Sequence, residues 1–137
     1  LFPYTTLFRS SRHVLVVHSE DGLDEISIGA PTHVAELHHD AITRYTVRPE
    51  DFGLERADIG RLAVDSPAES LATVLDVLAG TPGPARDIVA LNSGAAILAA
   101  DLVDSLGEGV ERAVQLMTSG AARARLDALV KLTNSFA

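Results

Sequence analysis

The chain has 137 residues, 47 % of them hydrophobic, which is enough to bury the core of one domain. Its 19 acidic and 11 basic residues give a formal charge of -8, which disfavours binding to nucleic acid or to anionic lipid. The absence of cysteine excludes disulfides and thiolate metal sites and is typical of the reducing cytoplasm. No apolar run reaches the length of a membrane span. We therefore expect a cytoplasmic domain without a nucleic-acid or membrane partner.

The first ten residues, LFPYTTLFRS, match the in-frame translation of a sequencing adapter, and the chain starts with Leu1 rather than Met. We interpret residues 1–10 as an assembly artefact and assign the natural sequence to residues 11–137. The alternative is a genuine strand or loop anchored by Phe2 and Tyr4. Under the first interpretation, the N-terminal part of the natural protein is missing from this chain.

The first predicted strand runs from His13 to His18. Its unalternating run Val14-Leu15-Val16-Val17 is typical of a strand buried on both faces in a parallel sheet. The strand leads into Ser19-Glu20-Asp21-Gly22, a stretch whose acidic and turn-forming residues predict a loop.

A β-hairpin is predicted next, with strands over Thr32–Leu37 and Ile42–Val47 and a short connection through residues 38–41. Glycine would suit a left-handed turn better than Ala41 does, so we expect a strain of about 1 kcal/mol if Ala41 adopts a positive φ. The stretch Pro49–Leu54 then breaks the strand and predicts one helical turn.

Four helices are predicted over the rest of the chain. Two of them begin at serine residues, Ser66 and Ser105, that are each followed three residues later by glutamate, as in a capping box. Gly80 is expected to stop the first helix, and Gly120 is expected to end or kink the third.

Two of these helices carry a packing prediction. The helix from about Ala85 to Val103 is apolar almost all round, so we expect it to be buried, with Gly94 permitting close approach of a neighbour. The last helix is expected to turn Leu126, Leu129 and Val130 inward on one face.

The order of strand, acidic loop, hairpin and four helices predicts an α/β fold with helices packed against a sheet. A single buried parallel strand cannot form a sheet by itself. We therefore expect its partner strands to come from outside this chain, which would leave the sheet incomplete here.

The stretch with the clearest chemical potential is residues 18–27, HSEDGLDEIS, because it places four carboxylates within six residues, on Glu20, Asp21, Asp24 and Glu25. It follows the carboxyl end of a predicted buried strand, the edge at which open α/β sheets bind ligands. Hard oxygen donors suit magnesium rather than zinc. On the residues alone, a solvated acidic surface loop explains the same pattern, and this alternative stays open.

Other polar groups suggest packing rather than chemistry. His18 either orients the acidic loop or is a hydrogen-bonded histidine at a strand end. The adjacent His38 and His39 lie in a turn, where neighbouring side chains diverge, so a metal site built on this pair is disfavoured. Asn92 lies in a buried helix, where packing or a hydrogen bond to another helix is expected.

Five stretches together resemble the anthranilate phosphoribosyltransferase family. They are VLVVHSEDGLDEIS at residues 14–27 with APTHVAEL at 30–37, PEDFGL at 49–54, and the helical segments at 83–102 and 105–130. The similarity runs from about residue 12 to the C-terminus. The GLDEIS and PEDFGL stretches make the resemblance specific to this family, whereas the alanine-rich helices alone would not.

The resemblance implies that residues 11–137 form the C-terminal part of the catalytic α/β domain. It implies transfer of a phosphoribosyl group from phosphoribosyl pyrophosphate to anthranilate in tryptophan biosynthesis, with release of pyrophosphate, in an enzyme that forms homodimers. The Asp-Glu pair of the family motif binds Mg2+ and corresponds to Asp24 and Glu25. No catalytic or substrate-binding residue is carried over to this chain.

The chain also departs from the family pattern. The glycine-rich phosphate loop and the Lys-His-Gly-Asn stretch of the family are absent, so we expect the chain alone to be inactive. Ser19 replaces a usual glycine and could tighten the loop or tilt its carboxylates. Two alternatives remain open: a related phosphoribosyltransferase with another acceptor, and a non-catalytic α/β module that binds magnesium or a protein.

Overall fold

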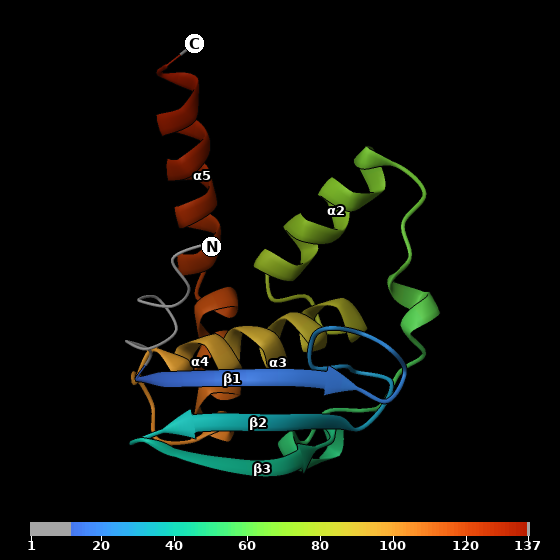
Figure 1. The fold of residues 1–137 in the computed structure, drawn as a ribbon. Coiled ribbons are helices and arrows are strands. Elements are labelled where there is room, and N and C mark those ends of the chain that lie inside the picture. The colour runs from blue at the N-terminus through green and yellow to red at the C-terminus, as the bar shows by residue number, and fades with distance from the viewer. Residues whose placement is uncertain (1–11, 137) are drawn as a thin grey trace, which may run out of the picture.

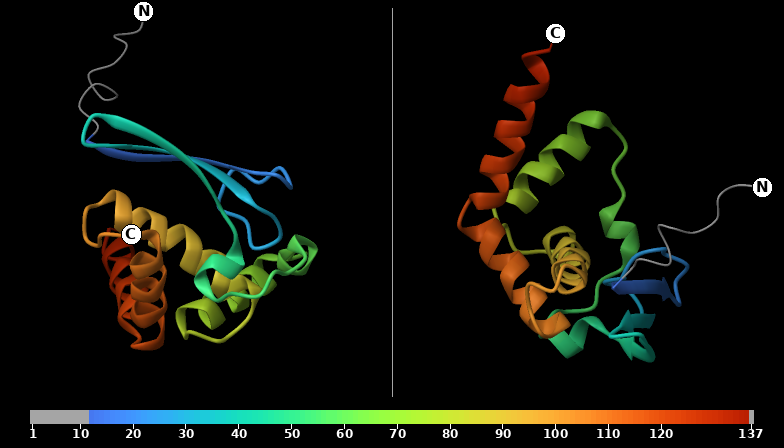
Figure 2. Two further views of the ribbon diagram at one scale, coloured as in Figure 1. Left: turned by 90° about the horizontal axis from the view of Figure 1, so that it is seen from below. Right: turned by 60° about the vertical axis from the view of Figure 1, so that its left-hand side comes forward.

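The computed structural model describes residues 12–136, in which a three-stranded sheet has all its helices on one face (Figure 1 and Figure 2). The elements are β1 (His13–Ser19), β2 (Thr32–His38), β3 (Ala41–Val47), the 3-10 helices η1 (Pro49–Phe52) and η2 (Ile59–Leu62), α2 (Pro67–Leu78), α3 (Pro84–Ala99), α4 (Leu106–Thr118) and α5 (Ala121–Asn134). The prediction of an α/β fold with strand, hairpin and four helices is confirmed. None of the described helices combines the length and apolar character needed to cross a membrane.

The sheet is antiparallel throughout, in the order β1-β2-β3. β1 pairs with β2 from His13 opposite His38 to Ser19 opposite Thr32, so the prediction of a parallel strand with its partners elsewhere is wrong. Val16 is 63 % exposed, which shows that the helices cover only one face of β1. An apolar run records a tendency toward burial but carries no information on the direction of the neighbouring strand. Within the described residues β1 is an edge strand, in line with an incomplete sheet.

In the hairpin turn, the residues with positive φ are His39 and Asp40 rather than Ala41. His38 and Ala41 form the last strand pair, and the two residues between them adopt positive φ, 49° at His39 and 62° at Asp40. Positive φ at both central residues is the pattern of a type I′ turn, which matches the twist of the strands. The expected strain at Ala41 is therefore wrong, since Ala41 is already the first residue of β3.

The predicted helix caps are confirmed. The hydroxyls of Ser66 and Ser105 each accept a hydrogen bond of 3.2 Å from the backbone N–H of the glutamate three residues later. This contact satisfies one of the N–H groups that have no partner inside the helix. Gly80 and Gly120 follow the ends of α2 and α4 with φ of 75° and 77°, so both glycines end the preceding helix.

Helix α3 ends at Ala99, four residues before the predicted end at Val103. Asp101 adopts φ of 55°, and a left-handed residue after the last turn ends an α-helix. The prediction missed this end because aspartate is less usual at such a position than glycine. Asp101 therefore lies at the C-terminal end of α3, close to the start of β1.

Helix α3 packs chiefly on α4, and glycine permits the contact. A Cβ atom added to Gly94 would lie 2.6 Å from the backbone nitrogen of Val110, and one added to Gly109 would overlap the carbonyl of Gly94. The predicted role of Gly94 agrees with this geometry. Buried side chains around the crossing include Leu91, Leu98, Ala113 and Met117.

Helices α2 and α5 project away from the sheet (Figure 1 and Figure 2). Leu129 is 56 % exposed and Val130 is also exposed, so the prediction that the last helix turns these residues inward is wrong. Leu71 and Val74 of α2 are exposed as well. Amphipathic spacing predicts which side chains share a face, but nothing among the described residues covers this face of α5.

Replacing Gly94 with alanine should destabilise the chain by about 1–3 kcal/mol, because the added methyl group would press on the backbone of α4. The matched control is Gly107→Ala in α4, where the nearest atom to an added Cβ is the Ser105 hydroxyl at 3.9 Å. The control should be neutral or stabilising by about 0.5 kcal/mol. Urea unfolding measures both, and equal effects of the two substitutions would contradict the close helix crossing.

Candidate functional site

The loop of residues 20–31 connects β1 to β2 and carries Asp24 and Glu25. It lies at the end of the sheet opposite the β2–β3 hairpin (Figure 1). Both carboxylates are exposed, and within residues 12–136 neither makes a hydrogen bond or an ion pair. Their oxygen atoms therefore face solvent and are accessible to a cation.

The backbone beside this pair is held by Asn92 of α3. The Asn92 Oδ1 atom accepts a hydrogen bond of 2.9 Å from the Ile26 N–H, and its Nδ2 donates to the Ile26 carbonyl, also at 2.9 Å. Nδ2 also donates to the Ile88 carbonyl at 2.9 Å. One side chain thus satisfies both backbone groups of Ile26, as a neighbouring strand would. The hydrogen bond joins a helix to a loop, not to another helix as the sequence suggested.

The residues that follow the pair are fully inside the protein. Ile26 is 2 % exposed, and Ser27 and Ile28 are completely buried. The Ser27 N–H donates to the Thr32 hydroxyl at 3.1 Å, which ties the loop to the first residue of β2. The exposed carboxylates of Asp24 and Glu25 are therefore joined directly to a segment that the core immobilises.

Asp21, a third carboxylate of the loop, has a structural position. Its Oδ2 atom accepts a hydrogen bond of 2.6 Å from the Ser27 hydroxyl, and its Oδ1 accepts one of 3.4 Å from the Leu23 N–H. Burial alone would raise the pKa of Asp21, but the hydrogen bonds from the Ser27 hydroxyl and the Leu23 backbone N–H outweigh it and lower this pKa. Asp21 is thus ionised and turned into the loop.

Glu20, the fourth carboxylate, points to a histidine rather than to Asp24 and Glu25. Its Oε1 atom lies 3.4 Å from Nε2 of His33 on β2. His18, which the sequence left as an orienting or merely bonded residue, is exposed, and its imidazole makes no hydrogen bond within the described part of the chain. The four carboxylates therefore separate into two that are engaged and two, Asp24 and Glu25, that face solvent.

Ser19 ties the two ends of the loop together. Its side chain is buried, and its hydroxyl donates to the Pro31 carbonyl at 3.2 Å. Its backbone N–H donates to the Leu23 carbonyl at 3.1 Å. Glycine at position 19 would lack the hydroxyl contact. This geometry agrees with the expectation that Ser19 tightens the loop, while its hydroxyl makes no hydrogen bond to Asp24 or Glu25.

A hollow of about 520 Å³ adjoins the carboxylate pair between the loop, η2 and α3. Leu23 and Glu25 line it from the loop, and Ile88 and Asn92 line it from α3. Its surface is mostly apolar apart from Glu25 and Asn92. A polar group bound at Asp24 and Glu25 would therefore lie at the rim of an apolar surface.

The described loop can hold a hard divalent cation through Asp24 and Glu25, since magnesium is usually bound by one or two carboxylates plus oxygen atoms of a substrate phosphate. The sequence indicated these two residues. It predicted a hydrogen bond for Asn92, because a buried amide needs partners, but it did not indicate that Asn92 or Ser27 holds the loop that carries the pair.

Comparison with known proteins places this chain among glycosyl transferases. The profile described as "Glycosyl transferase family, a/b domain" matches residues 5–123. This range starts within residues 1–10, so the adapter interpretation of that segment stays a prediction. The segment also lies outside the described residues.

The similar proteins are anthranilate phosphoribosyltransferases. The chain is 61 % identical over 127 residues to the Methylococcus capsulatus enzyme, covering 93 % of this chain and 37 % of the relative. A crystal structure of the Thermus thermophilus enzyme matches with a TM-score of 0.78 and 38 % identity, covering 87 % of this chain and 35 % of that one. A Saccharomyces cerevisiae enzyme in complex with PRPP and Mg shares the fold, with a TM-score of 0.78 and 24 % identity over 88 % of this chain and 35 % of that one.

The chain spans little more than a third of the length of these relatives. The resemblance to anthranilate phosphoribosyltransferases, drawn from the GLDEIS and PEDFGL stretches, is confirmed. The chain belongs to the a/b-domain glycosyl transferase family.

Proposed function

We propose that residues 11–137 are the C-terminal part of the catalytic α/β domain of an anthranilate phosphoribosyltransferase. The whole enzyme would transfer a phosphoribosyl group from phosphoribosyl pyrophosphate to the amine of anthranilate and release pyrophosphate. The observation that carries the proposal is the exposed Asp24-Glu25 pair joined to a buried anchor, in a chain 61 % identical to the Methylococcus capsulatus enzyme.

Asp24 and Glu25 fit a magnesium ion. They offer hard oxygen donors, both are exposed, and neither has a competing cationic partner among the described residues. Bound there, magnesium would neutralise the negative charge that develops on the pyrophosphate leaving group. The Saccharomyces cerevisiae enzyme, which has the same fold and whose structure contains PRPP and Mg, supports the proposal that this fold binds magnesium.

The other residues of the loop position this pair. Asn92 holds Ile26, the residue after Glu25, and Ser27 joins Asp21 to the buried segment. The glycine-rich phosphate loop expected from the resemblance is not in this sequence. This chain would therefore supply the metal ligands, and the rest of the enzyme would supply the contacts to substrate phosphates and to anthranilate. A homodimer of the whole enzyme is part of the same proposal.

The two alternatives have weaker support. A different acceptor or a non-catalytic module would be expected to bring similarity to other groups of proteins, whereas this chain is 61 % identical to the Methylococcus capsulatus anthranilate phosphoribosyltransferase. A chimera tests the choice. Residues 12–137 replace the matching segment of the Methylococcus capsulatus enzyme, and phosphoribosyl transfer to anthranilate is assayed. Full folding without transfer would contradict the proposal.

In this chimera, the double substitution Asp24→Asn with Glu25→Gln should lower magnesium-dependent transfer by more than about a hundredfold, because it removes both charged ligands without changing side-chain size. Glu20→Gln is the matched control, since Glu20 is an exposed carboxylate of the same loop that faces His33. The control should keep most of the activity. Unchanged turnover of the double variant at limiting magnesium would exclude the metal assignment.

Asn92→Leu removes the hydrogen bonds to Ile26 and keeps a similar volume. We expect the magnesium concentration for half-maximal activity to rise about tenfold or more, with turnover at saturating magnesium less affected, because the ligands lose their fixed position. Exchange of the Ile26 amide hydrogen should accelerate in parallel. A simple loss of stability would not change the magnesium requirement.

The control for Asn92→Leu is Ser93→Ala, at the next position of α3, whose hydroxyl makes no hydrogen bond in the described range. Ser93→Ala should leave both the magnesium requirement and the Ile26 exchange rate unchanged. If Asn92→Leu matches this control in both measurements, Asn92 has no positioning role.

A further inference from the structure

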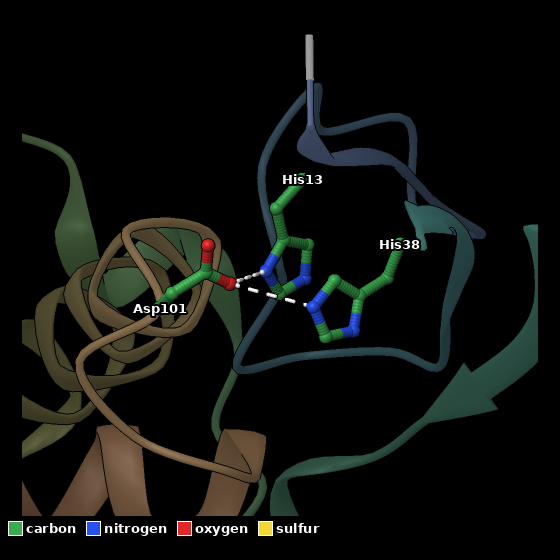
Figure 3. A group of neighbouring side chains, drawn as sticks. All are labelled: His13, His38 and Asp101. Carbon is green, nitrogen blue, oxygen red and sulfur yellow. Dashed lines mark hydrogen bonds and ion pairs between the residues drawn. The ribbon is translucent and has the colours of Figure 1, made fainter. Parts of the chain in front are cut away.

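A second group of polar side chains meets at the end of the sheet away from Asp24 and Glu25 (Figure 3). It consists of His13 at the start of β1, His38 at the end of β2, and Asp101 just after α3. The Asp101 Oδ1 atom lies 2.6 Å from Nδ1 of His13 and 3.5 Å from Nε2 of His38. One donor atom from each residue lies within 4.8 Å of the other two, so the three converge on one point.

The two imidazole rings are stacked, with centroids 4.1 Å apart and planes inclined by 13°. In Figure 3 the dashed lines from both rings end at the carboxylate of Asp101. The rings of His38 and His39 are stacked with centroids 3.8 Å apart, so the expectation that these adjacent side chains diverge is wrong. His38 also stacks on a different histidine, His13, which lies opposite it on the neighbouring strand.

A neutral His13 has too few protons to donate to both of its carboxylate neighbours, Glu36 and Asp101. The His13 side chain is only 2 % exposed, and its Nε2 atom lies 2.8 Å from Oε1 of Glu36. A neutral imidazole carries one N–H, so it can donate to only one carboxylate. If it donates to Glu36, its Nδ1 lone pair faces the Asp101 oxygen at 2.6 Å, and that contact is repulsive unless a cation lies between them.

Glu36 is itself held in place. Its other oxygen accepts a hydrogen bond of 2.8 Å from the Tyr45 hydroxyl, so Tyr45, Glu36 and His13 form a chain of hydrogen bonds. A carboxylate behind a metal-binding histidine is the usual means of fixing the tautomer and directing the other ring nitrogen at the metal. The Nδ1 atom of His13 is thus prepared as a ligand.

Asp101 lies at a position where its negative charge is unfavourable without a bound cation. It follows the C-terminal end of α3, and the helix dipole disfavours a carboxylate there. It also adopts a left-handed φ of 55°, a conformation that aspartate tolerates better than most residues. Its side chain is 59 % exposed, so an ion from solvent can reach it. A cation bound to Asp101 would offset the unfavourable helix dipole.

From these contacts we infer that His13, His38 and Asp101 bind a divalent transition-metal ion, with Zn2+ the best match. Two imidazole nitrogens and one carboxylate oxygen are the donors that Zn2+ prefers, whereas magnesium prefers oxygen donors alone. Three protein ligands leave one tetrahedral position for water. This inference does not depend on the proposed transferase function.

Binding requires a small local opening. Bonds of roughly 2.0–2.1 Å in a tetrahedral site separate neighbouring ligand atoms by roughly 3.3 Å. The distance of 3.5 Å from His38 Nε2 to Asp101 Oδ1 is already close to this value, whereas the 2.6 Å from His13 Nδ1 to Asp101 Oδ1 is too short. Asp101 is exposed and can move by this amount. The bound ion would tie β1, β2 and the end of α3 together. It would lie roughly 20 Å from the loop after β1, the length of a seven-residue strand.

The competing arrangement is an imidazolium of His13 that donates to both carboxylates and binds no metal. Burial lowers the pKa of His13, but the hydrogen bonds to Asp101 and Glu36 outweigh it and raise this pKa. A protonated His13 donates to both carboxylates, and a neutral His38 that carries its proton on Nε2 would direct it at Asp101. Measuring metal binding distinguishes the two arrangements.

The test is a titration of Zn2+ into the 137-residue chain by calorimetry, at a pH of about 8 so that protons compete weakly. All proteins carry Asp24→Asn and Glu25→Gln, so that binding at that pair is not counted. We expect one Zn2+ per chain. Asp101→Asn, which keeps a residue that tolerates the left-handed φ, and His38→Gln should each abolish it. With Co2+ in place of Zn2+, visible absorption bands of a four-coordinate site should appear and disappear in the same variants.

The controls are His39→Gln, which changes the histidine stacked on His38, and Asp104→Asn, an exposed aspartate three residues beyond Asp101. Both should bind Zn2+ like the reference chain, which carries only Asp24→Asn and Glu25→Gln. No binding by that chain, or an equal loss in His39→Gln and His38→Gln, would overturn the inference. Circular dichroism verifies folding, and any variant that fails to fold alone is measured in the Methylococcus chimera, where cooperative thermal unfolding followed by circular dichroism verifies the fold.

Discussion

The hydrogen bonds between Asn92 and the backbone of Ile26 are the contact on which the acidic loop depends. A loop with four carboxylates has a strong tendency to spread into solvent, because its charges repel one another. The amide of Asn92 opposes this by satisfying the N–H and the carbonyl of one loop residue from a rigid helix. The position of Asn92 depends in turn on the close crossing of α3 and α4 at Gly94 and Gly109.

Helix α3 also explains why the two ends of the sheet differ in chemistry. Near one end its side chain Asn92 orders a loop whose outer carboxylates, Asp24 and Glu25, have no cationic partner among the described residues. At the other end, α3 is followed by Asp101, whose carboxylate meets two imidazoles. Oxygen donors alone suit a hard cation, and nitrogen donors shift the preference toward transition metals. A single helix therefore places two different donor sets at the two ends of β1.

The features that the sequence predicted are local ones. Ser66 and Ser105 cap helices through residues three positions away, and the hairpin follows from two short strands and the turn between them. The features that it missed join distant segments: Asn92 reaches Ile26 across 66 residues, and His13 reaches Asp101 across 88. Periodicity and capping patterns carry no information on such pairs, nor on whether the strand beside β1 runs parallel or antiparallel to it.

Within the described residues, three side chains hold the loop that carries the Asp24-Glu25 pair. Ser19 closes the loop at its ends, Ser27 engages Asp21 inside it, and Asn92 fixes the residue after the pair. A metal centre whose ligand positions are determined within one segment can be carried into a homologous enzyme with its geometry intact. Contacts to a substrate that arise between segments cannot be carried in this way. The metal site that we propose at Asp24 and Glu25 would therefore depend on this segment for the position of its protein ligands, and on other parts of the polypeptide for contacts to substrate.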